Sequence, residues 1–460
     1  MITKIGCIGY RGFSNFQELP LAIPNGKKGS GLTVLVGPNS GGKSTLVECF
    51  SKINQHEPSF TEGKRNKFAN DKVKIEIHYD GKMGTLQTVE SGGSETTWIP
   101  PYDKPLIYYI PSRRVFNPFF GKGMWDRLTF IQNPEISQFR GNPLNNFTMR
   151  LFDANRNSSM EFNELFWKIL GKELHWTIDQ DDSGQYYTKI QKADTIFHNS
   201  EGLGEGVVSL LFIVDALFQA QPNELIVIDE PELSLHPQLQ KRLLDAILET
   251  TKKVQIVIST HSPMMISIDS IINNGQIARV HEIKGSSTIS HIDETCRQYF
   301  KSSLNNIYNP HIFGNDARAC FFAEDGVLIT EGQEDVVLIP RLLEKLEISD
   351  HISLFGFGAG GASNIKNIAY ILKCLGFSNI CALFDGDKKE ECAKFNQEFE
   401  QFGYKAWSLP ADDIRDKEKH ESGAKQGILD KNCQIKSEID KNNLKKMFCE
   451  IIEFSRIKQC

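Results

Sequence analysis

A glycine-rich segment near the N-terminus has the residue types and spacing of a phosphate-binding loop. In GLTVLVGPNSGGKST the pattern G-x-x-x-x-G-K-[ST] is met by Gly37, Gly42, Lys43 and Ser44, between an apolar strand and a predicted helix. Backbone N–H groups would face the phosphates, Lys43 would meet the β- and γ-oxygens, and Ser44 would help to hold Mg²⁺. A glycine-rich turn with an incidental lysine is the alternative, which the flanking elements disfavour. The predicted ATP contacts are Gly37, Pro38, Asn39, Ser40, Gly41, Gly42, Lys43, Ser44 and Thr45.

The segment LIVIDEPE supplies the carboxylates that such a loop needs. Its apolar residues predict a buried strand that ends in Asp229 and Glu230. Asp229 suits Mg²⁺ binding through water, and Glu230 suits polarisation of the attacking water. Adjacent carboxylates at a strand end could instead be surface charges, but a phosphate-binding loop in the same chain requires this partner.

Two further segments carry residues for the same site. NSEGLGEG precedes a predicted helix and forms a second anion-binding turn, with Ser200 and Gly202 as candidate nucleotide contacts. The strand QIVIST leads to His261, whose place after a strand end suits contact with the γ-phosphate. A lone histidine is more often structural, but the surrounding motif favours the functional interpretation.

A second set of carboxylates follows predicted strands in the C-terminal half. Glu331 comes directly after VLIT, Asp335 about one helical turn later, and Asp385 and Asp387 after ICALF. Carboxyl ends of parallel strands meet at one edge of a sheet, so these side chains are expected to converge. Hard oxygen donors suit Mg²⁺ or Mn²⁺, and such a cluster of like charges is unfavourable without a cation. Taken singly, each pattern could be an ordinary helix start or a loop.

These residues require two sheets with helices on their faces. Residues 1–50 read as strand, loop, strand, glycine loop and helix, and residues 206–259 alternate helix and buried strand. That alternation predicts a parallel sheet. A second alternation begins at VLITEG and continues through the glycine-rich turn FGFGAGGASNIK. The predicted fold class is therefore α/β, with a nucleotide-binding part and a separate, smaller parallel-sheet domain.

The same patterns predict domain boundaries. We expect the nucleotide-binding domain over residues 1–275, with a helical insertion at 117–195. Residues 276–322 have few strong signals and are expected to form a linker or an oligomerisation segment. The smaller domain is expected over residues 323–430, followed by a tail of exposed helices at 431–460.

Composition and charge exclude several classes of protein. The 460 residues, 40% of them hydrophobic and 24% charged, indicate two or three globular domains. The net charge of -6 argues against a generally basic nucleic-acid coat, although a local basic groove would suffice for DNA. The sequence has no leader-like start and no run of roughly 18 apolar residues, so we expect a cytoplasmic protein with no membrane association. Its ten cysteines form no CxxC pair and are expected to be reduced thiols.

The first set of motifs resembles the ABC-type ATPase heads over roughly residues 1–270. DEPELSLHP and STHSP resemble the soluble branch that includes the RecF, SMC and OLD-like proteins. Two heads of that group sandwich two ATP molecules, so the resemblance implies a homodimer in which Ser200 reaches the γ-phosphate across the interface. YIPSRR is similar to a segment of OLD-like ATPases, and Arg113 and Arg114 are candidates for phosphate or partner contacts, with a solvated pair as the alternative. Gln132 and Gln138 are candidates for the Q-loop glutamine.

The second set resembles a Toprim domain over about residues 323–430, which implies metal-dependent phosphodiester chemistry. By that resemblance Glu331 would act on the reaction and the metal, while Asp335, Asp385 and Asp387 would bind metal.

LPADDIRDKE and GAKQGILD are similar to an extension of this site in OLD-type proteins. The resemblance implies a further carboxylate, Asp413 or else Asp416, and makes Lys425 a candidate for stabilising charge on the reacting phosphate. The chain departs from the pattern at Arg415, where an acidic residue is expected. Solvated charges are the alternative for each of these residues.

An ABC-type head followed by a Toprim domain resembles the OLD (overcoming lysogenization defect) family of ATP-dependent endonucleases over most of the chain. The resemblance implies ATP and Mg²⁺ or another divalent ion such as Mn²⁺ as cofactors, DNA as substrate, and a homodimer or higher homo-oligomer. It also implies a role in defence against phage. Short members act beside partner genes, which makes a retron reverse transcriptase and its RNA–DNA product candidate partners.

Three functions are compatible with these motifs. The first is a DNA endonuclease in which ATP controls access to the metal site. The second is an ATPase or DNA-binding sensor, similar to RecF or SMC proteins, whose Toprim part is a non-catalytic platform, as Arg415 would allow. The third is a repair clamp that binds DNA without cleavage, which the pair Asp385 and Asp387 disfavours.

Overall fold

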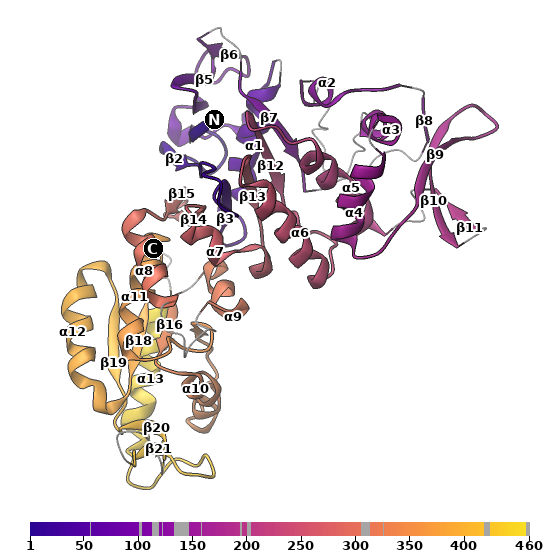
Figure 1. The fold of residues 1–460 in the computed structure, drawn as a ribbon. Coiled ribbons are helices and arrows are strands. Elements are labelled where there is room, and N and C mark those ends of the chain that lie inside the picture. Colours follow the sequence, from indigo (N-terminus) through magenta and orange to yellow (C-terminus); the bar gives the residue numbers. More distant parts are fainter. Residues whose placement is uncertain are drawn as a thin grey trace. The chain divides into compact units, whose positions relative to one another are not determined.

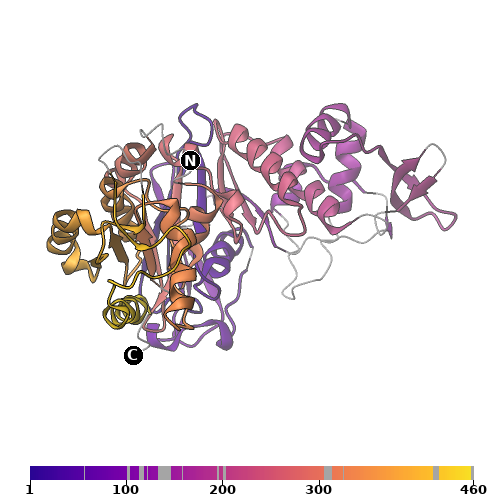
Figure 2. The ribbon, with the colours of Figure 1, turned by 90° about the horizontal axis from the view of Figure 1, so that it is seen from below.

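The computed structural model divides into two compact units, Met1–Ile289 and Ser290–Cys460 (Figure 1). Figure 2 shows the second unit in orange to yellow. Each unit is built on its own parallel sheet, as the sequence predicts. The structure describes residues 1–55, 57–100, 104–112, 119–121, 123–132, 147–157, 159–193, 196–199, 204–304, 313–324, 326–417 and 424–456.

A six-stranded sheet forms the centre of the first unit, with the strand order β15-β14-β3-β13-β12-β7. β3 pairs in parallel with β13 and β14, and β12 pairs in parallel with β13 and β7. The residues of β12 and β13 are all buried, which explains why both strands are nearly continuous apolar runs. The strands are β3 (Leu32–Val36), β7 (Leu106–Ile110), β12 (Glu224–Asp229), β13 (Gln255–Ser259), β14 (Gln276–Ile283) and β15 (Ser286–His291).

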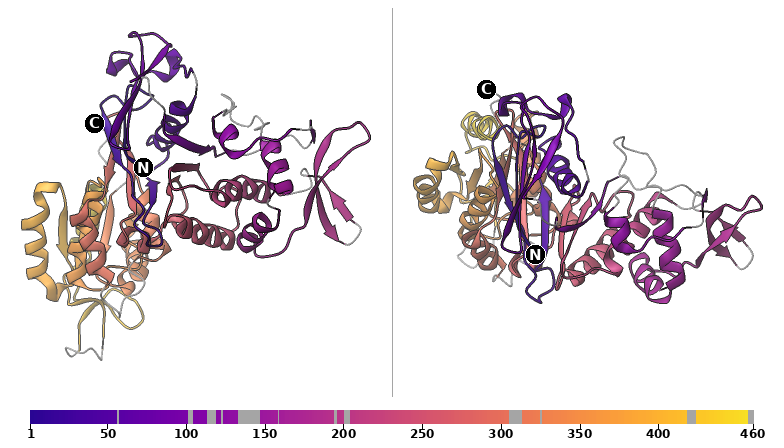
Figure 3. Two further views of the ribbon diagram at one scale, coloured as in Figure 1. Left: turned by 45° about the horizontal axis from the view of Figure 1, so that its top comes forward. Right: turned by 90° about the horizontal axis from the view of Figure 1, so that it is seen from above.

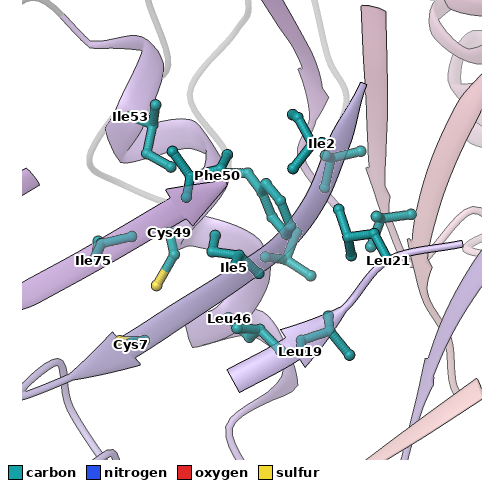
Figure 4. Close-up of a cluster of buried hydrophobic side chains, with 14 of the residues drawn as sticks. Ile2, Ile5, Cys7, Leu19, Leu21, Leu46, Cys49, Phe50, Ile53 and Ile75 are labelled. Carbon is teal, nitrogen blue, oxygen red and sulfur yellow. The ribbon is translucent and has the colours of Figure 1, made fainter. Parts of the chain in front are cut away.

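Helix α1 (Lys43–Asn54) joins this sheet to a five-stranded antiparallel sheet of order β2-β1-β4-β5-β6. Leu46, Phe50 and Ile53 recur on one face of α1 and are fully buried. Figure 4 shows them beside Ile5 of β1 and Ile75 of β4. This packing holds the start of α1, and with it the glycine loop. The strands are β1 (Ile2–Ile8), β2 (Gln17–Pro20), β4 (Lys74–Tyr79), β5 (Lys82–Thr88) and β6 (Thr96–Ile99).

The insertion expected at residues 117–195 contains strands as well as helices, so its description as helical was incomplete. β9 and β10 form an antiparallel hairpin, visible beyond the helices in Figure 3. The alternation in YYTKIQKA is the period-two signal that indicates such a strand. The elements are β8 (Phe119–Phe120), α2 (Arg127–Gln132), α3 (Phe147–Asn157), α4 (Ser159–Leu170), β9 (Trp176–Gln180), β10 (Tyr186–Ala193) and β11 (Ile196–His198).

A buried polar network attaches α3 to the rest of the first unit. The guanidinium of Arg150 lies 2.7 Å from Asp215 Oδ1 on α5, and the Tyr108 hydroxyl of β7 donates to Asp215 Oδ2 at 2.6 Å. Burial of unpaired charge is unfavourable, so each group specifies the place of the others. The remaining helices of this unit are α5 (Glu205–Phe218), α6 (Pro237–Thr250) and α7 (Ile268–Ile272).

The second unit is a four-stranded parallel sheet of order β17-β16-β18-β19 with helices on both faces (Figure 1). Leu328 and Leu383 share a core with α10 and α13, whereas Phe384 faces α12 on the other side. The strands are β16 (Val327–Thr330), β17 (Ser353–Leu354), β18 (Cys381–Phe384), β19 (Lys405–Ser408), β20 (Asp413–Arg415) and β21 (Gly427–Leu429). The helices are α8 (Glu294–Leu304), α9 (Asn315–Ala319), α10 (Gln333–Lys345), α11 (Ala362–Cys374), α12 (Lys389–Phe399) and α13 (Lys441–Ser455).

The expected linker at 276–322 is not a separate segment. β14 pairs with β3 of the first unit, and α8 packs against α11 of the second, so the boundary falls at Ile289. The sequence could not indicate this because the partner strand β3 lies more than two hundred residues away.

The tail expected at 431–460 does contain a helix, α13, but the expectation that it is exposed was wrong. Leu444, Phe448, Ile451 and Ile452 line one side of α13 and are buried in the core of the second unit. Among the residues that the structure covers, no helix has the length and apolar character needed to cross a membrane.

The packing of α13 can be tested with the variant Phe448→Ala. Phe448 is fully buried, so its truncation leaves a cavity and is expected to lower the free energy of unfolding by about 3–5 kcal/mol. Chemical denaturation followed by fluorescence measures the change. Lys446→Ala, at an exposed position of the same helix, should stay within about 0.5 kcal/mol of the parent. Equal stability of the two variants would contradict the packing.

Candidate nucleotide and metal sites

The phosphate-binding loop connects the end of β3 to the first turn of α1. Gly37 and Gly42 have φ values of 127° and 113°, a region that side-chain-bearing residues rarely adopt. A Cβ atom on Gly37 would lie 2.3 Å from the carbonyl oxygen of Val280 on β14. The loop therefore needs glycine for its backbone conformation and for the close approach of β14.

Lys43 is buried at the start of α1, and its ammonium turns back onto the loop. Nζ donates hydrogen bonds to the carbonyl oxygens of Gly37, at 2.8 Å, and Pro38, at 2.7 Å. The lysine is thus held beside the space that the loop encloses. Ser44 and Thr45 follow it in the first turn of the helix.

The carboxylates after β12 lie within electrostatic reach of Lys43. Burial lowers the pKa of Lys43 to about 8, while the charges of Glu230, Asp229 and Glu232 act to raise it. Asp229 ends β12 opposite Ser259 of β13, and the backbone N–H of Glu230 donates to the Ser259 carbonyl at 2.8 Å. The two separate motifs that the sequence predicts to share a site are therefore brought together.

His261 joins the same group. Its Nε2 lies 3.9 Å from Glu230 Oε1. Burial and the positive charge of Lys43 lower the pKa of His261, and Glu230 opposes this effect. The neutral imidazole is therefore favoured at neutral pH, and a neutral ring has one donor and one acceptor nitrogen.

Glu232 is a residue of this site that the sequence interpretation missed. Its Oε1 accepts a hydrogen bond from the backbone N–H of His261 at 2.6 Å. Burial raises the pKa of Glu232. The third acidic residue in DEPE was the available signal, since a buried carboxylate in a tight turn needs a donor partner. Glu232 ties the segment that carries His261 to the turn after β12.

Several expected contacts lie outside the described residues, namely Ser200, Gly202, Arg113, Arg114 and Gln138. The other Q-loop candidate, Gln132, ends α2 and is exposed. The described part of the site fits ATP, because the loop presents backbone and a buried cation opposite two carboxylates. Ser44 and Asp229 are the residues that would hold the accompanying Mg²⁺.

The second set of carboxylates converges at one edge of the other sheet. Glu331 follows β16, and its Oε1 accepts a hydrogen bond from the backbone N–H of Asp385 at 2.9 Å. Asp335, in the first turn of α10, accepts from the backbone N–H of Gly332 at 2.9 Å. Asp387 lies in the short turn after β18. The chain thus brings strand ends that are far apart in sequence to one place.

Lys425 lies at the centre of this edge. Its Nζ is 2.9 Å from Asp387 Oδ2, 3.7 Å from Asp385 Oδ2 and 4.0 Å from Asp413 Oδ2. We name these four residues, together with Glu331 and Asp335, the carboxylate cluster.

Burial and mutual repulsion disfavour ionisation within the carboxylate cluster. Burial, then the charges of Glu331, Asp413 and Asp335, raises the pKa of Asp385 to about 8. Burial also raises the pKa of Asp335 to about 6, with Asp413 adding to the effect. The pKa of Glu331 is raised for the same reasons. A bound cation would stabilise the ionised forms.

The structure distinguishes between Asp413 and Asp416, the two candidates for an additional carboxylate at the Toprim site. Asp413 is buried, and its Oδ2 accepts a hydrogen bond from Lys417 Nζ at 2.6 Å. Asp416 instead pairs with Lys436 at 2.9 Å, outside the carboxylate cluster. Asp413 is therefore the member of the pair that reaches Lys425.

Arg415 is accommodated by a carboxylate that the sequence interpretation overlooked. It forms an ion pair with Glu334 of α10, and Lys417 Nζ lies 3.2 Å from Glu334 Oε2. The positive charge of Arg415 is thus balanced beside the carboxylate cluster. Ser363 and Lys366 lie in the first turns of α11, where Lys366 pairs with Glu398 at 2.7 Å.

The donor set suits a hard divalent cation. Carboxylate oxygens are the donors that such cations prefer, and the raised pKa values of Asp385 and Asp335 are typical of carboxylates crowded together without a cation. Glu331, Asp335, Asp385 and Asp387 are the residues that would hold the ion. With the side chains as they stand, no three His, Cys, Asp or Glu residues in the described ranges are close enough to hold a metal together. The ammonium of Lys425 lies between the aspartates, so binding would require local rearrangement.

Two family models match the chain. One is described as "AAA domain, putative AbiEii toxin, Type IV TA system" and covers residues 133–267, which include Asp229, Glu230 and His261. The other is described as "Overcoming lysogenization defect protein-like, TOPRIM domain" and covers residues 321–387, which include Glu331 and Asp385. The chain carries an AAA-type ATPase domain and an OLD-like Toprim domain. The α/β fold class predicted from the motifs is confirmed.

Curated relatives carry names of the same kind. The ATPase–Toprim chain is 30% identical to the Old nuclease of Escherichia phage P2 over 27% of its length and 21% of that protein. It is 30% identical to the OLD nuclease of Thermus scotoductus over 38% of its length and 33% of the relative. It is 24% identical to the endonuclease GajA of Bacillus cereus over 44% of its length and 33% of the relative. The chain thus spans about a fifth to a third of these relatives.

Among solved structures, the chain is similar to the Smc head domain with an extended coiled coil bound to the C-terminal domain of ScpA, from Pyrococcus furiosus. The match has a TM-score of 0.43 and 12% identity, and covers 66% of this chain and 99% of that one.

The role of Lys43 can be tested with Lys43→Ala. Loss of a charge-assisted contact to the phosphates is expected to weaken ATP binding about 10- to 100-fold. Isothermal calorimetry with a non-hydrolysable ATP analogue measures the affinity. Lys27→Ala, an exposed lysine outside the loop, is the control and should bind as the parent does. Unchanged affinity in Lys43→Ala would exclude this loop as the nucleotide site.

Proposed function

We propose that the chain is an ATP-regulated, metal-dependent DNA endonuclease of the OLD type. The observation that carries the proposal is the carboxylate cluster, in which Glu331, Asp335, Asp385 and Asp387 share one sheet edge with Lys425. A complete loop, lysine and carboxylate set for ATP in the same chain supports the regulatory part.

Four residues of the carboxylate cluster have proposed roles in phosphodiester hydrolysis, namely Glu331, Asp385, Asp387 and Lys425. Divalent ions at such a site activate a water and stabilise the leaving oxygen. Glu331 holds the turn that carries Asp385 through its hydrogen bond to the backbone N–H of that residue. Lys425 is the one cationic group that contacts both Asp385 and Asp387 among the described residues, so it would meet the non-bridging oxygens of the phosphate. Its displacement from the aspartates by substrate would leave them free to bind metal.

The ATPase residues have proposed roles of the same kind. Lys43 exchanges the carbonyl oxygens of Gly37 and Pro38 for phosphate oxygens when nucleotide binds. Glu230 orients and polarises the attacking water, and His261, held by Glu232, contacts the γ-phosphate.

We further propose DNA as the substrate, a cytoplasmic homodimer formed through the ATPase domains, and a role in defence against phage. The match to a model named for overcoming lysogenization defect supports the last point. The retron reverse transcriptase stays a prediction that depends on resemblance alone.

A second function, an ATPase-only sensor with a non-catalytic Toprim platform, is favoured by one observation. Lys425 already neutralises part of the carboxylate cluster, as a structural ion pair would. A plasmid-nicking assay with Mg²⁺ or Mn²⁺, with and without ATP, distinguishes the two functions, because only the endonuclease converts supercoiled to open-circular DNA.

The double variant Asp385→Ala with Asp387→Ala tests the endonuclease. Loss of two oxygen donors is expected to reduce metal-dependent nicking about 100-fold or more, because several kcal/mol of transition-state stabilisation disappear. ATP binding should be unchanged. Asp412→Ala, an exposed aspartate directly before Asp413, is the matched control and should nick at the parental rate. Nicking that survives in the double variant would refute the proposed site.

The variant Glu230→Gln tests the ATPase mechanism. It keeps the size of the side chain but removes the carboxylate, so ATP should still bind while hydrolysis falls about 100-fold or more. Phosphate release measures the rate of hydrolysis. Light scattering after chromatography measures whether the dimer of this variant accumulates when ATP is present. Unchanged hydrolysis would remove Glu230 from the mechanism, and a monomer at saturating ATP would remove the head dimer.

A further inference from the structure

A cavity lies on the α11 and α12 side of the Toprim sheet. It has a volume of about 460 Å³ and lies between the first turns of α11 and the length of α12. Phe384 of β18 lines it, and Asp385 of the carboxylate cluster is the next residue along the chain. The cavity is therefore within one residue of a proposed metal ligand.

The inner wall of this cavity is aromatic. Phe384 and Phe395 are 2% and 4% exposed, and their ring centroids lie 6.0 Å apart at 62°. Side chains alternate along a strand, so Leu383 enters the core with α10 and α13 while Phe384 faces the cavity. Ala362, the first residue of α11, also lines the cavity and has only a methyl side chain.

The polar residues of the cavity carry charges that cancel. Lys366 and Lys394 line it together with Glu391 and Glu398, and Lys366 Nζ pairs with Glu398 at 2.7 Å. A phosphate site needs an excess of positive charge, which this lining lacks. A neutral occupant with both donor and acceptor edges matches it better. An aromatic wall with balanced donors and acceptors is the chemistry that recognises a nucleobase.

A third aromatic side chain, that of Phe357, lies near the end of β16. Phe357 is 45% exposed in the loop between Gly356 and Gly358. The loop is anchored to the end of β16, since the backbone N–H of Ala359 donates to the Thr330 carbonyl at 2.8 Å. An exposed phenylalanine held in this way offers a stacking surface for a neighbouring base.

We propose that the cavity receives an unpaired nucleobase of the DNA strand whose phosphate lies at the carboxylate cluster. A base inside a duplex must first be unpaired and unstacked before it can enter such a cavity, which costs free energy, whereas a single-stranded base avoids that cost. The substrate class is therefore DNA with single-stranded or unstacked nucleotides beside the cleaved bond. The inference rests on the proposed endonuclease function and names its substrate class.

Equilibrium binding of the full chain to labelled oligonucleotides tests the proposal, with EDTA present so that no cleavage occurs. The probes are a short single strand, the duplex of the same sequence, and a strand of equal length with abasic sites in place of bases. The variant Ala362→Phe fills the cavity. Ala393→Phe introduces the same side chain at an exposed position of α12 outside the cavity and is the matched control.

The single strand should bind more tightly than the duplex, and Ala362→Phe should weaken single-strand binding about tenfold, the effect of losing one base–aromatic contact. Binding of the abasic strand should not change, and Ala393→Phe should behave as the parent. Equal single-strand affinity in parent and Ala362→Phe would overturn the proposal. So would an equal loss with the abasic strand, because the cavity would then not read a base.

Two further results separate this inference from its premises. If Ala362→Phe does not fold, as judged by circular dichroism, Gln397→Trp narrows the opening from an exposed position and should give the same base-dependent loss. If the chain nicks plasmid DNA but shows no base-dependent binding, the cavity proposal is overturned and the endonuclease proposal stands. Base-dependent binding by a chain that does not nick overturns the endonuclease and leaves a base-binding cavity.

Discussion

A lysine ammonium that faces carboxylates from strand ends is the interaction on which both sites depend. In the first unit Lys43 lies within reach of Asp229 and Glu230, and in the second Lys425 contacts Asp385 and Asp387. Burial by itself disfavours the charged forms of Lys43, Lys425 and Asp385. The opposite charges counteract that effect: the carboxylates act to raise the pKa of Lys43, and Lys425 acts to lower that of Asp385.

The surrounding structure keeps these charges at one edge of each sheet. Parallel strands end on the same side, so groups from distant segments collect there without long loops. In the first unit the close contact between Gly37 and Val280 sets the loop, and Glu232 holds the segment of His261. In the second, Glu331 binds the backbone after β18 directly. Glu232 and Glu331 thus each fix a backbone segment beside their site.

The edge of the Toprim sheet joins two surfaces of different character. The carboxylate cluster is charged and suited to a phosphate with its cations, whereas the cavity behind Phe384 is aromatic and balanced in charge. A strand with period-two alternation produces this contrast, because Leu383 and Phe384 must face opposite sides. One nucleotide has the same two-part character, with a charged phosphate and a neutral base.

The motifs alone were enough to predict a phosphate-binding loop, its partner carboxylates and a second carboxylate set, because each depends on residues that are adjacent in sequence or lie at strand ends. Only the tertiary structure decided between Asp413 and Asp416. Folding brings Asp413 near Lys425 of the carboxylate cluster, whereas Asp416 pairs with Lys436. The tertiary structure also assigned β14 to the six-stranded sheet of the first unit and α13 to the core of the second unit. It showed in addition that Glu232 bonds the backbone of His261 and that Glu334 pairs with Arg415. Those outcomes depend on contacts between residues far apart in the chain, and local residue patterns carry no information about which distant partner is chosen.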